Sequence, residues 1–282
     1  MKNIWVLAGL IAVAVILSAG CICSVNAQSS GHSQGLAYDG TYYYYITQTG
    51  ISKYDSNWKL VSSNPNAAGQ CGSGVDYMGS GKVYNGVLYA IAVGGSTNDA
   101  YLGMWGTSDL HFIRSINLAE VDGWFPPTGL QSSASAVTVN PSANAFAVVS
   151  YGEAPPPQSN GIQGAIFLYD FTTFAYKGVI SPSHTMWNSQ GIDYYNGHYY
   201  VTALSDSQAN QGNFSTGGVF MESTNGGGAT RIIPYSRFAN GGELQGIDVR
   251  STGIRVQCGA YVYTFTTAPP YTLVQTVKLP TQ

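Results

Sequence analysis

Gln190-Gly-Ile-Asp-Tyr194 is one of five related pentapeptides that divide this chain into units of similar length. The others are Gln34-Gly-Leu-Ala-Tyr38, Ser73-Gly-Val-Asp-Tyr77, Ser135-Ala-Val-Thr-Val139 and Gln245-Gly-Ile-Asp-Val249. Their starts lie roughly 40–60 residues apart, a spacing typical of stacked supersecondary repeats. The spacing of the pentapeptides therefore indicates a fold built from repeated units.

The residues after each pentapeptide indicate the kind of repeat. Short runs rich in Val, Ile, Tyr, Phe and Thr follow it, and Gly, Asn, Asp and Ser separate them, as in His198-Tyr-Tyr-Val-Thr202 and Gly218-Val-Phe-Met221. Four such runs per unit predict an all-β fold, a five-bladed β-propeller of four-stranded antiparallel blades. The expected blades are 34–64, 73–118, 135–180, 190–236 and 245–279, within one domain spanning 34–282. A four-stranded sandwich repeat is the competing interpretation.

Residues 1–27 have the pattern of a targeting segment. Lys2 precedes the apolar run from Ile4 to Leu17, and small residues follow it. Three endings stay open: cleavage after Ala27, lipidation at Cys21 in a lipobox-like sequence, or retention as a membrane anchor. Each one predicts a secreted or extracytoplasmic protein, with residues 28–33 as a spacer and membrane contact only through the N-terminal segment.

Two cysteines remain in the expected folded part, Cys71 and Cys258. Both are expected on the same face of a propeller, and export places them in an oxidising compartment. They are therefore predicted to form a disulfide. Two unpaired buried thiols are the alternative.

The long connections of the predicted propeller should open on one face, opposite tight turns such as Tyr84-Asn-Gly86 and Tyr195-Asn-Gly197. Function concentrates in long loops on a rigid scaffold. Aromatic side chains in polar, Pro- and Gly-rich links suit a sugar ring or a protein partner, although they could instead anchor the loops. The candidate ligand-binding residues are Trp124, Phe125, His184, Trp187, Phe238 and Asn240.

The fourth residue of three pentapeptides is an aspartate: Asp76, Asp193 or Asp248. A shared register would bring these carboxylates to one level of the central channel. Crowded carboxylates repel one another unless they share a cation or a proton, and ligand sets made only of oxygen favour Ca²⁺. The alternative is that each carboxylate accepts hydrogen bonds from backbone amides of a neighbouring blade.

The predicted blade number, these acids and the run Gly81-Lys-Val-Tyr-Asn-Gly-Val-Leu-Tyr89 resemble the olfactomedin-type propeller. That resemblance implies an extracellular interaction domain with a central cation site. The Gln-Gly-x-x-Tyr opening looks equally like the repeats of many bacterial and archaeal secreted propellers.

Three functional hypotheses follow from these features. The first is an exported binding module whose partner is a glycan or an extracellular protein, with Ca²⁺ as a possible cofactor. The second is a glycoside hydrolase that uses Asp76, Asp193, Asp248 and Glu243. The third is a structural component of the cell envelope. Nucleic-acid binding is not expected, because 11 Lys and Arg face 14 Asp and Glu without a basic cluster.

Overall fold

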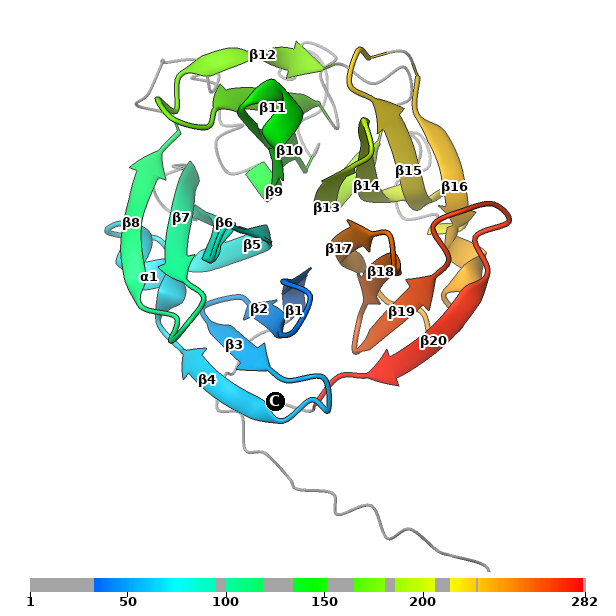
Figure 1. Cartoon of the computed structure of the whole chain (residues 1–282), viewed down its shortest axis with the longest axis horizontal. Coiled ribbons are helices and arrows are strands. Elements are labelled where there is room, and N and C mark those ends of the chain that lie inside the picture. The colour runs from blue at the N-terminus through cyan, green and yellow to red at the C-terminus, as the bar shows by residue number, and fades with distance from the viewer. Residues whose placement is uncertain are drawn as a thin grey trace, which may run out of the picture.

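The computed structural model describes residues 33–94, 100–118, 134–151, 165–180, 186–205, 214–226 and 228–280. Strands β1 to β20 of this part form five antiparallel four-stranded units arranged around a centre (Figure 1). The predicted β-propeller architecture is therefore confirmed. Among the described residues, no helix has the length and apolar character needed to cross a membrane.

The strands of each unit pair in chain order. The first unit contains β1 Ser33–Tyr38, β2 Tyr43–Thr47, β3 Ile51–Tyr54 and β4 Leu60–Asn64, and helix α1 Ala67–Cys71 follows it. The second contains β5 Tyr77–Tyr84, β6 Val87–Val93, β7 Ala100–Gly106 and β8 Phe112–Asn117. The third contains β9 Ala134–Asn140, β10 Ala145–Ser150, β11 Ile166–Asp170 and β12 Tyr176–Ile180. The fourth contains β13 Trp187–Tyr195, β14 His198–Ser205, β15 Gly218–Ser223 and β16 Thr230–Pro234, and the fifth contains β17 Leu244–Arg250, β18 Gly253–Cys258, β19 Tyr261–Phe265 and β20 Leu273–Lys278.

The first strand of each unit lies at the centre and the fourth lies at the rim (Figure 1). The inner strands approach one another so closely that β5 and β9 share a parallel bridge between Ser80 and Ala136. Glycine makes this approach possible in other units. A Cβ atom added at Gly191 would overlap the carbonyl oxygen of Gln245, and one added at Gly246 would overlap the backbone of Leu36.

The hydrophobic core is divided into clusters between neighbouring units. Tyr44 and Trp105 belong to the cluster between the first and second units, and Tyr89 and Phe146 to the next. The cluster that joins the fifth unit to the first is the smallest within the described residues, and consists of Leu36, Tyr45, Tyr54, Val262 and Leu279. Few apolar side chains therefore hold the fifth unit against the first. Polar contacts near the axis contribute more to closing the ring at this junction.

The structure corrects the expected register of the second unit. Strand β5 begins at Tyr77, so the first four residues of the pentapeptide, Ser73 to Asp76, precede the inner strand instead of forming it. The bridge between Ser80 and Ala136 aligns residues 79–83 with 135–139. The Asn-Gly turns agree, because Lys82 lies three residues before Asn85, as Asp193 does before Asn196. Lys82, and not Asp76, is therefore the counterpart of Asp193.

Candidate functional site at the two ends of the axis

The corrected register places one residue from each inner strand at the same level of the axis. Two are the carboxylates of Asp193 and Asp248, whose side chains are fully buried. The complete set is Ala37, Lys82, Thr138, Asp193 and Asp248.

Lys82 crosses the axis from the second unit to the fourth and fifth. Its Nζ lies 2.6 Å from Oδ2 of Asp193 and 3.1 Å from Oδ1 of Asp248. Burial by itself lowers the pKa of Lys82, but the two carboxylates outweigh it and raise that pKa above its ordinary value. Burial raises the pKa of Asp193, against the opposing charge of Lys82. The ammonium group therefore stays charged between the two acids.

Asp193 also receives hydrogen bonds from its neighbours. The hydroxyl of Thr138 donates to Oδ1 over 2.9 Å, and the backbone N–H of Val249 donates to Oδ2 over 2.6 Å. The second contact is the alternative that the sequence offered for these aspartates, a bond to a backbone amide of the next unit. Asp193 of the fourth unit thus contacts three other units, because Thr138 lies in β9, Lys82 in β5 and Val249 in β17.

Asp248 is paired with two arginines as well as with Lys82. Oδ2 lies 3.1 Å from Nε of Arg250 and 3.5 Å from Nη1 of Arg255. Arg250 donates a further hydrogen bond to the carbonyl oxygen of Tyr38. The guanidinium carbons lie 5.3 Å (Arg250) and 4.6 Å (Arg255) from the centre of the Tyr38 ring. This cluster therefore connects the fifth unit to the first, where the apolar core is smallest.

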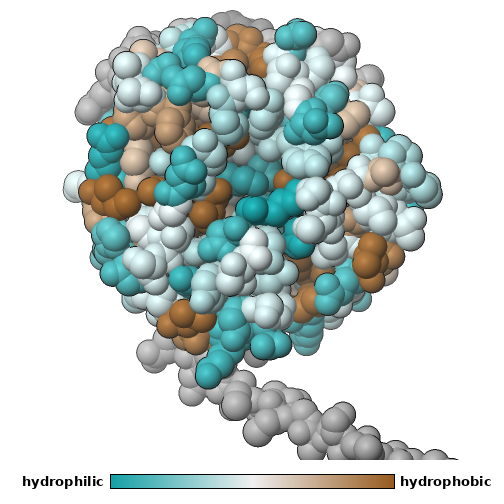
Figure 2. Space-filling view, in the orientation of Figure 1, coloured by the Kyte–Doolittle hydropathy of each residue, from teal (hydrophilic) through white to brown (hydrophobic). Residues whose placement is uncertain are grey.

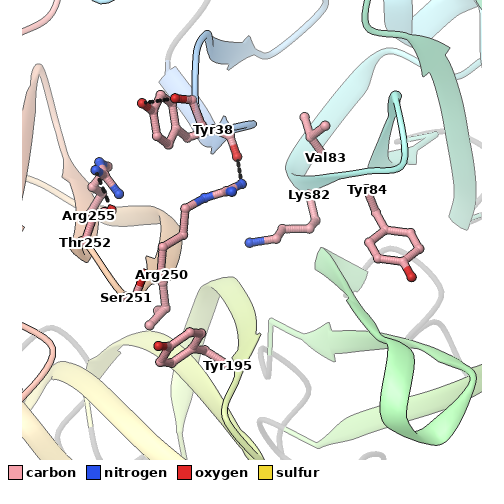
Figure 3. A pocket seen from close by; sticks show the side chains of 11 residues that line it. Tyr38, Lys82, Val83, Tyr84, Tyr195, Arg250, Ser251, Thr252 and Arg255 are labelled. Atoms are coloured by element: carbon pink, nitrogen blue, oxygen red, sulfur yellow. Dashed lines mark hydrogen bonds between the residues drawn. The ribbon is translucent and has the colours of Figure 1, made fainter.

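A pocket of about 580 Å³ opens beside this cluster, at the ends of the inner strands that lead into the tight turns. We call it the turn-face pocket. Figure 3 shows Lys82 and Arg250 pointing toward its middle and Tyr195 beside them. Hydrophilic surface gathers at the centre of the face seen in Figure 2. The lining residues are Tyr38, Gly40, Lys82, Val83, Tyr84, Tyr195, Val249, Arg250, Ser251, Thr252 and Arg255.

A second pocket, of about 450 Å³, lies at the opposite ends of the inner strands. We call it the loop-face pocket, and its lining consists of Gln34, Gln48, Asp76, Tyr77, Gly79, Val93, Ala134, Ser135, Tyr151 and Gln190. The hydroxyl of Tyr77 donates to Oε1 of Gln34. Nε2 of Gln190 lies 3.4 Å from the carboxylate of Glu243. Most polar groups that line the loop-face pocket are neutral amides and hydroxyls.

The structure brings together two of the three aspartates proposed as metal ligands. Asp193 and Asp248 share Lys82, whereas Asp76 is exposed and lines the loop-face pocket. Within the described residues, no group of three or more His, Cys, Asp or Glu side chains has the geometry to hold a metal ion. The same separation divides the hydrolase set, because Glu243 is exposed near Gln190 while Asp193 and Asp248 are buried.

The predicted disulfide is wrong. Cys71 and Cys258 are both free and buried. Cys71 packs with Trp105 in the core between the first and second units, and Cys258 packs with Phe238 between the fourth and fifth. Two thiols in different inter-unit cores cannot meet, although both elements lie toward the same face. Burial raises the pKa of each thiol to about 12.

The candidate ligand-binding residues divide into three groups. Trp124, Phe125 and His184 lie outside the described residues, as does the side chain of Trp187, whose backbone begins β13. Phe238 is not an exposed ligand contact, because only 3% of it is exposed and its ring packs against Tyr263. Asn240 is exposed, and its N–H donates to the Tyr263 hydroxyl.

Lys82, Arg250 and Arg255 were not among the residues expected at the site from the sequence. The signal for Lys82 was present in the two Tyr-Asn-Gly turns, since counting back from Asn85 and Asn196 aligns Lys82 with Asp193. The resemblance of Ser73–Tyr77 to the other pentapeptides concealed this alignment. Arg250 and Arg255 follow Asp248 along the β17–β18 hairpin, where a five-residue repeat could not identify them.

The similarities of this chain to known proteins are similarities of fold. No protein-family model and no curated protein sequence matches this chain. A hydrazine synthase structure from Kuenenia stuttgartiensis is similar, with 14% identity, coverage of 92% of this chain and 90% of that one, and a TM-score of 0.52. The Pan2 WD40 domain of Neurospora crassa has 10% identity, coverage of 86% and 66%, and a TM-score of 0.45. The Dos1 propeller has 11% identity, coverage of 88% and 58%, and a TM-score of 0.43.

Proposed function

We propose that this chain is an exported β-propeller that binds a glycan in the loop-face pocket. The observation that carries the proposal is the chemistry of that pocket's lining. Amide groups of Gln34, Gln48 and Gln190 can both donate and accept hydrogen bonds, which suits the hydroxyl groups of a sugar. The lining also includes the carboxylate of Asp76, and carboxylate oxygens accept hydrogen bonds from hydroxyl groups.

Aromatic rings at the same pocket supply the second requirement of a sugar site. Tyr77 and Tyr151 line the pocket, and 36% of Tyr77 is exposed. An amphipathic tyrosine offers an apolar face to a pyranose ring while its hydroxyl stays hydrogen-bonded. The volume of about 450 Å³ is in the range of small-ligand sites, which is enough for one or two sugar rings.

Export is part of the proposal, and it rests on the N-terminal pattern of a lysine, an apolar run and small residues. A glycan or an extracellular protein is the kind of partner that such a protein meets. The glycan has priority because neutral amides and tyrosines gather in one concave site. A flat surface would suit a protein partner better.

The test is a glycan array followed by titration calorimetry with the best neutral oligosaccharide. We expect Tyr77→Ala to weaken binding about tenfold or more, because the ring loses its stacking face. Tyr195→Ala is the matched control, since Tyr195 lines the turn-face pocket. Equal affinities for Tyr77→Ala and the parent chain would refute the site.

The same samples test the hydrolase hypothesis. Reducing-end assays on each bound oligosaccharide should show no cleavage, since the two buried acids Asp193 and Asp248 form ion pairs with Lys82 and do not line this pocket. Release of reducing ends that Glu243→Gln abolishes would establish the enzyme instead. Self-assembly of the purified chain without glycan binding would favour the structural role.

A further inference from the structure

The turn-face pocket presents positive charge to solvent and hides the negative charge beneath it. The side chains of Lys82, Arg250 and Arg255 are 12%, 29% and 11% exposed. The carboxylates with which they pair, those of Asp193 and Asp248, are 0% exposed. An approaching ligand therefore meets three cationic groups before it meets either acid.

We propose that this pocket binds a small monocarboxylate that carries a ring. The charge of the cluster supports a single negative charge on the ligand. Three cations and two carboxylates leave a net charge of +1, which one carboxylate neutralises and a phosphate dianion would reverse. Arginine also matches a carboxylate in geometry, since its N–H groups form a planar fork.

Arg250 has donors to spare for such a ligand. Its Nε bonds to Asp248 and its Nη2 to the carbonyl oxygen of Tyr38. Among the described residues, its Nη1 has no hydrogen-bonding partner, and this nitrogen lies near the open backbone of Gly40. Figure 3 shows the guanidinium held between Tyr38 and the middle of the pocket. A carboxylate that enters here can accept hydrogen bonds from Nη1 without displacing an existing bond.

The other walls favour an attached ring. Tyr195 lines the pocket on the side away from Tyr38 (Figure 3). Val83 and Tyr84 also line it, but the side chain of Val83 is buried between the first and second units and the ring of Tyr84 packs against Phe171. The rings of Tyr195 and Tyr38 offer aromatic surface to the body of the ligand while its charged end faces the arginines. The pocket of about 580 Å³ lies in the usual range for a ligand of this size. This site is independent of the proposed glycan site, because the two lie at opposite ends of the inner strands.

The experiment uses benzoate as the probe and benzamide as its neutral isostere, each titrated into the full chain at low salt and followed by saturation-transfer NMR. We expect benzoate to bind at least tenfold more tightly than benzamide, and its binding to weaken at 0.5 M NaCl through screening of the cationic wall. Inorganic phosphate, tested in parallel, should compete poorly. Equal affinities for the two aromatic probes, no benzoate binding at millimolar concentration, or stronger binding of phosphate would each overturn the proposal.

Two variants place the site. Arg250→Gln should reduce benzoate affinity about tenfold, because it removes the cationic fork. This variant also loses a link between the fifth and first units, so Tyr195→Ala serves as a second test that leaves the ion cluster unchanged. We expect Tyr195→Ala to weaken benzoate at least threefold while Tyr77→Ala leaves it unchanged. Loss of benzoate binding in Tyr77→Ala, or unchanged binding in both turn-face variants, would show that benzoate binds outside the turn-face pocket and would overturn the proposal.

Discussion

The two ends of the inner strands differ in how they are held together. At the turn face, Lys82, Asp193, Asp248 and Arg250 form a buried ionic cluster that reaches across the axis. At the loop face, the strands meet through backbone contacts at glycine and through the amides of Gln34, Gln190 and Gln245. The same repeated strand therefore carries charge at one end and neutral polar groups at the other.

The difference assigns closure of the ring to the turn face and leaves the loop face available for ligand binding. The small apolar core between the fifth and first units leaves closure of the ring to polar contacts, and the ionic cluster supplies them through Arg250 and Tyr38. A buried ion pair is sensitive to the loss of either partner, because the remaining charge is left uncompensated. Neutral amides tolerate changes of partner, which suits a surface that exchanges water for ligand. Four experiments test this contrast.

The largest effect is expected from Lys82→Met. This change leaves the buried carboxylates of Asp193 and Asp248 without the ammonium between them, and we expect a loss of about 3–5 kcal/mol in the free energy of unfolding. Urea denaturation measures it. Asp76→Asn is the control at the exposed loop-face acid and should change stability by less than about 0.5 kcal/mol. Adding Asp193→Asn to Lys82→Met should recover part of the loss. A similar loss in the two single variants would remove the contrast between the ends.

Gly191→Ala tests the backbone contact near the loop face. The added Cβ would overlap the carbonyl oxygen of Gln245, and overpacking of this kind costs about 1–3 kcal/mol. Ala136 occupies the same position in the third unit, so Ala136→Gly is the reciprocal control and should cost about 1–2 kcal/mol through backbone entropy and the loss of a buried methyl group. The measurement is again urea denaturation. A stabilised Gly191→Ala protein would show that the strands can separate there without loss.

The buried thiols give a pH-dependent effect of intermediate size. Burial raises the pKa of Cys71 and of Cys258 to about 12, above the ordinary value of 9.0. Each raised pKa contributes stability that is complete below pH 9 and is lost as the pH rises toward 12. At pH 10 the loss is about 1 kcal/mol per thiol. Cys71→Ala and Cys258→Ala should reduce this alkaline slope. Mass-spectrometric mapping should also find both thiols unmodified by iodoacetamide in the native protein at pH 8, and rapid native labelling would contradict their burial.

The smallest effect is expected from Ca²⁺. The ammonium of Lys82 already lies between Asp193 and Asp248, and Asp76 lines a different pocket, so the three carboxylates do not form one oxygen cage. We expect the melting temperature in millimolar Ca²⁺ to equal that in chelator. A bound ion at about 100 times its dissociation constant would instead add about 2.7 kcal/mol. An increase of that size, lost in Asp193→Ala, would restore the cation hypothesis.

The repeat in the sequence was enough to predict the propeller, because each blade is a local unit with its own strands and turns. Gln34, Gln190 and Gln245 lie at one level of the axis, because each stands three residues before the axial position of its inner strand. Asp193 and Asp248 were expected together for the same reason, and they are. These features follow from the spacing of the repeats along the chain, and that spacing is visible in the sequence itself.

Tertiary structure decided which similar-looking segments were equivalent and which distant side chains met. Ser73–Tyr77 matches the pentapeptide, but the geometry of β5 places Lys82 at the shared level and Asp76 on the surface. The two cysteines lie toward one face, yet they pack in different cores, because sheets divide the interior between units. Lys82 and Asp193 are far apart along the chain, and no local pattern pairs an ammonium with a carboxylate across an axis. That pairing exists only once the ring closes, because closure alone brings the inner strands of all the units within reach of one another.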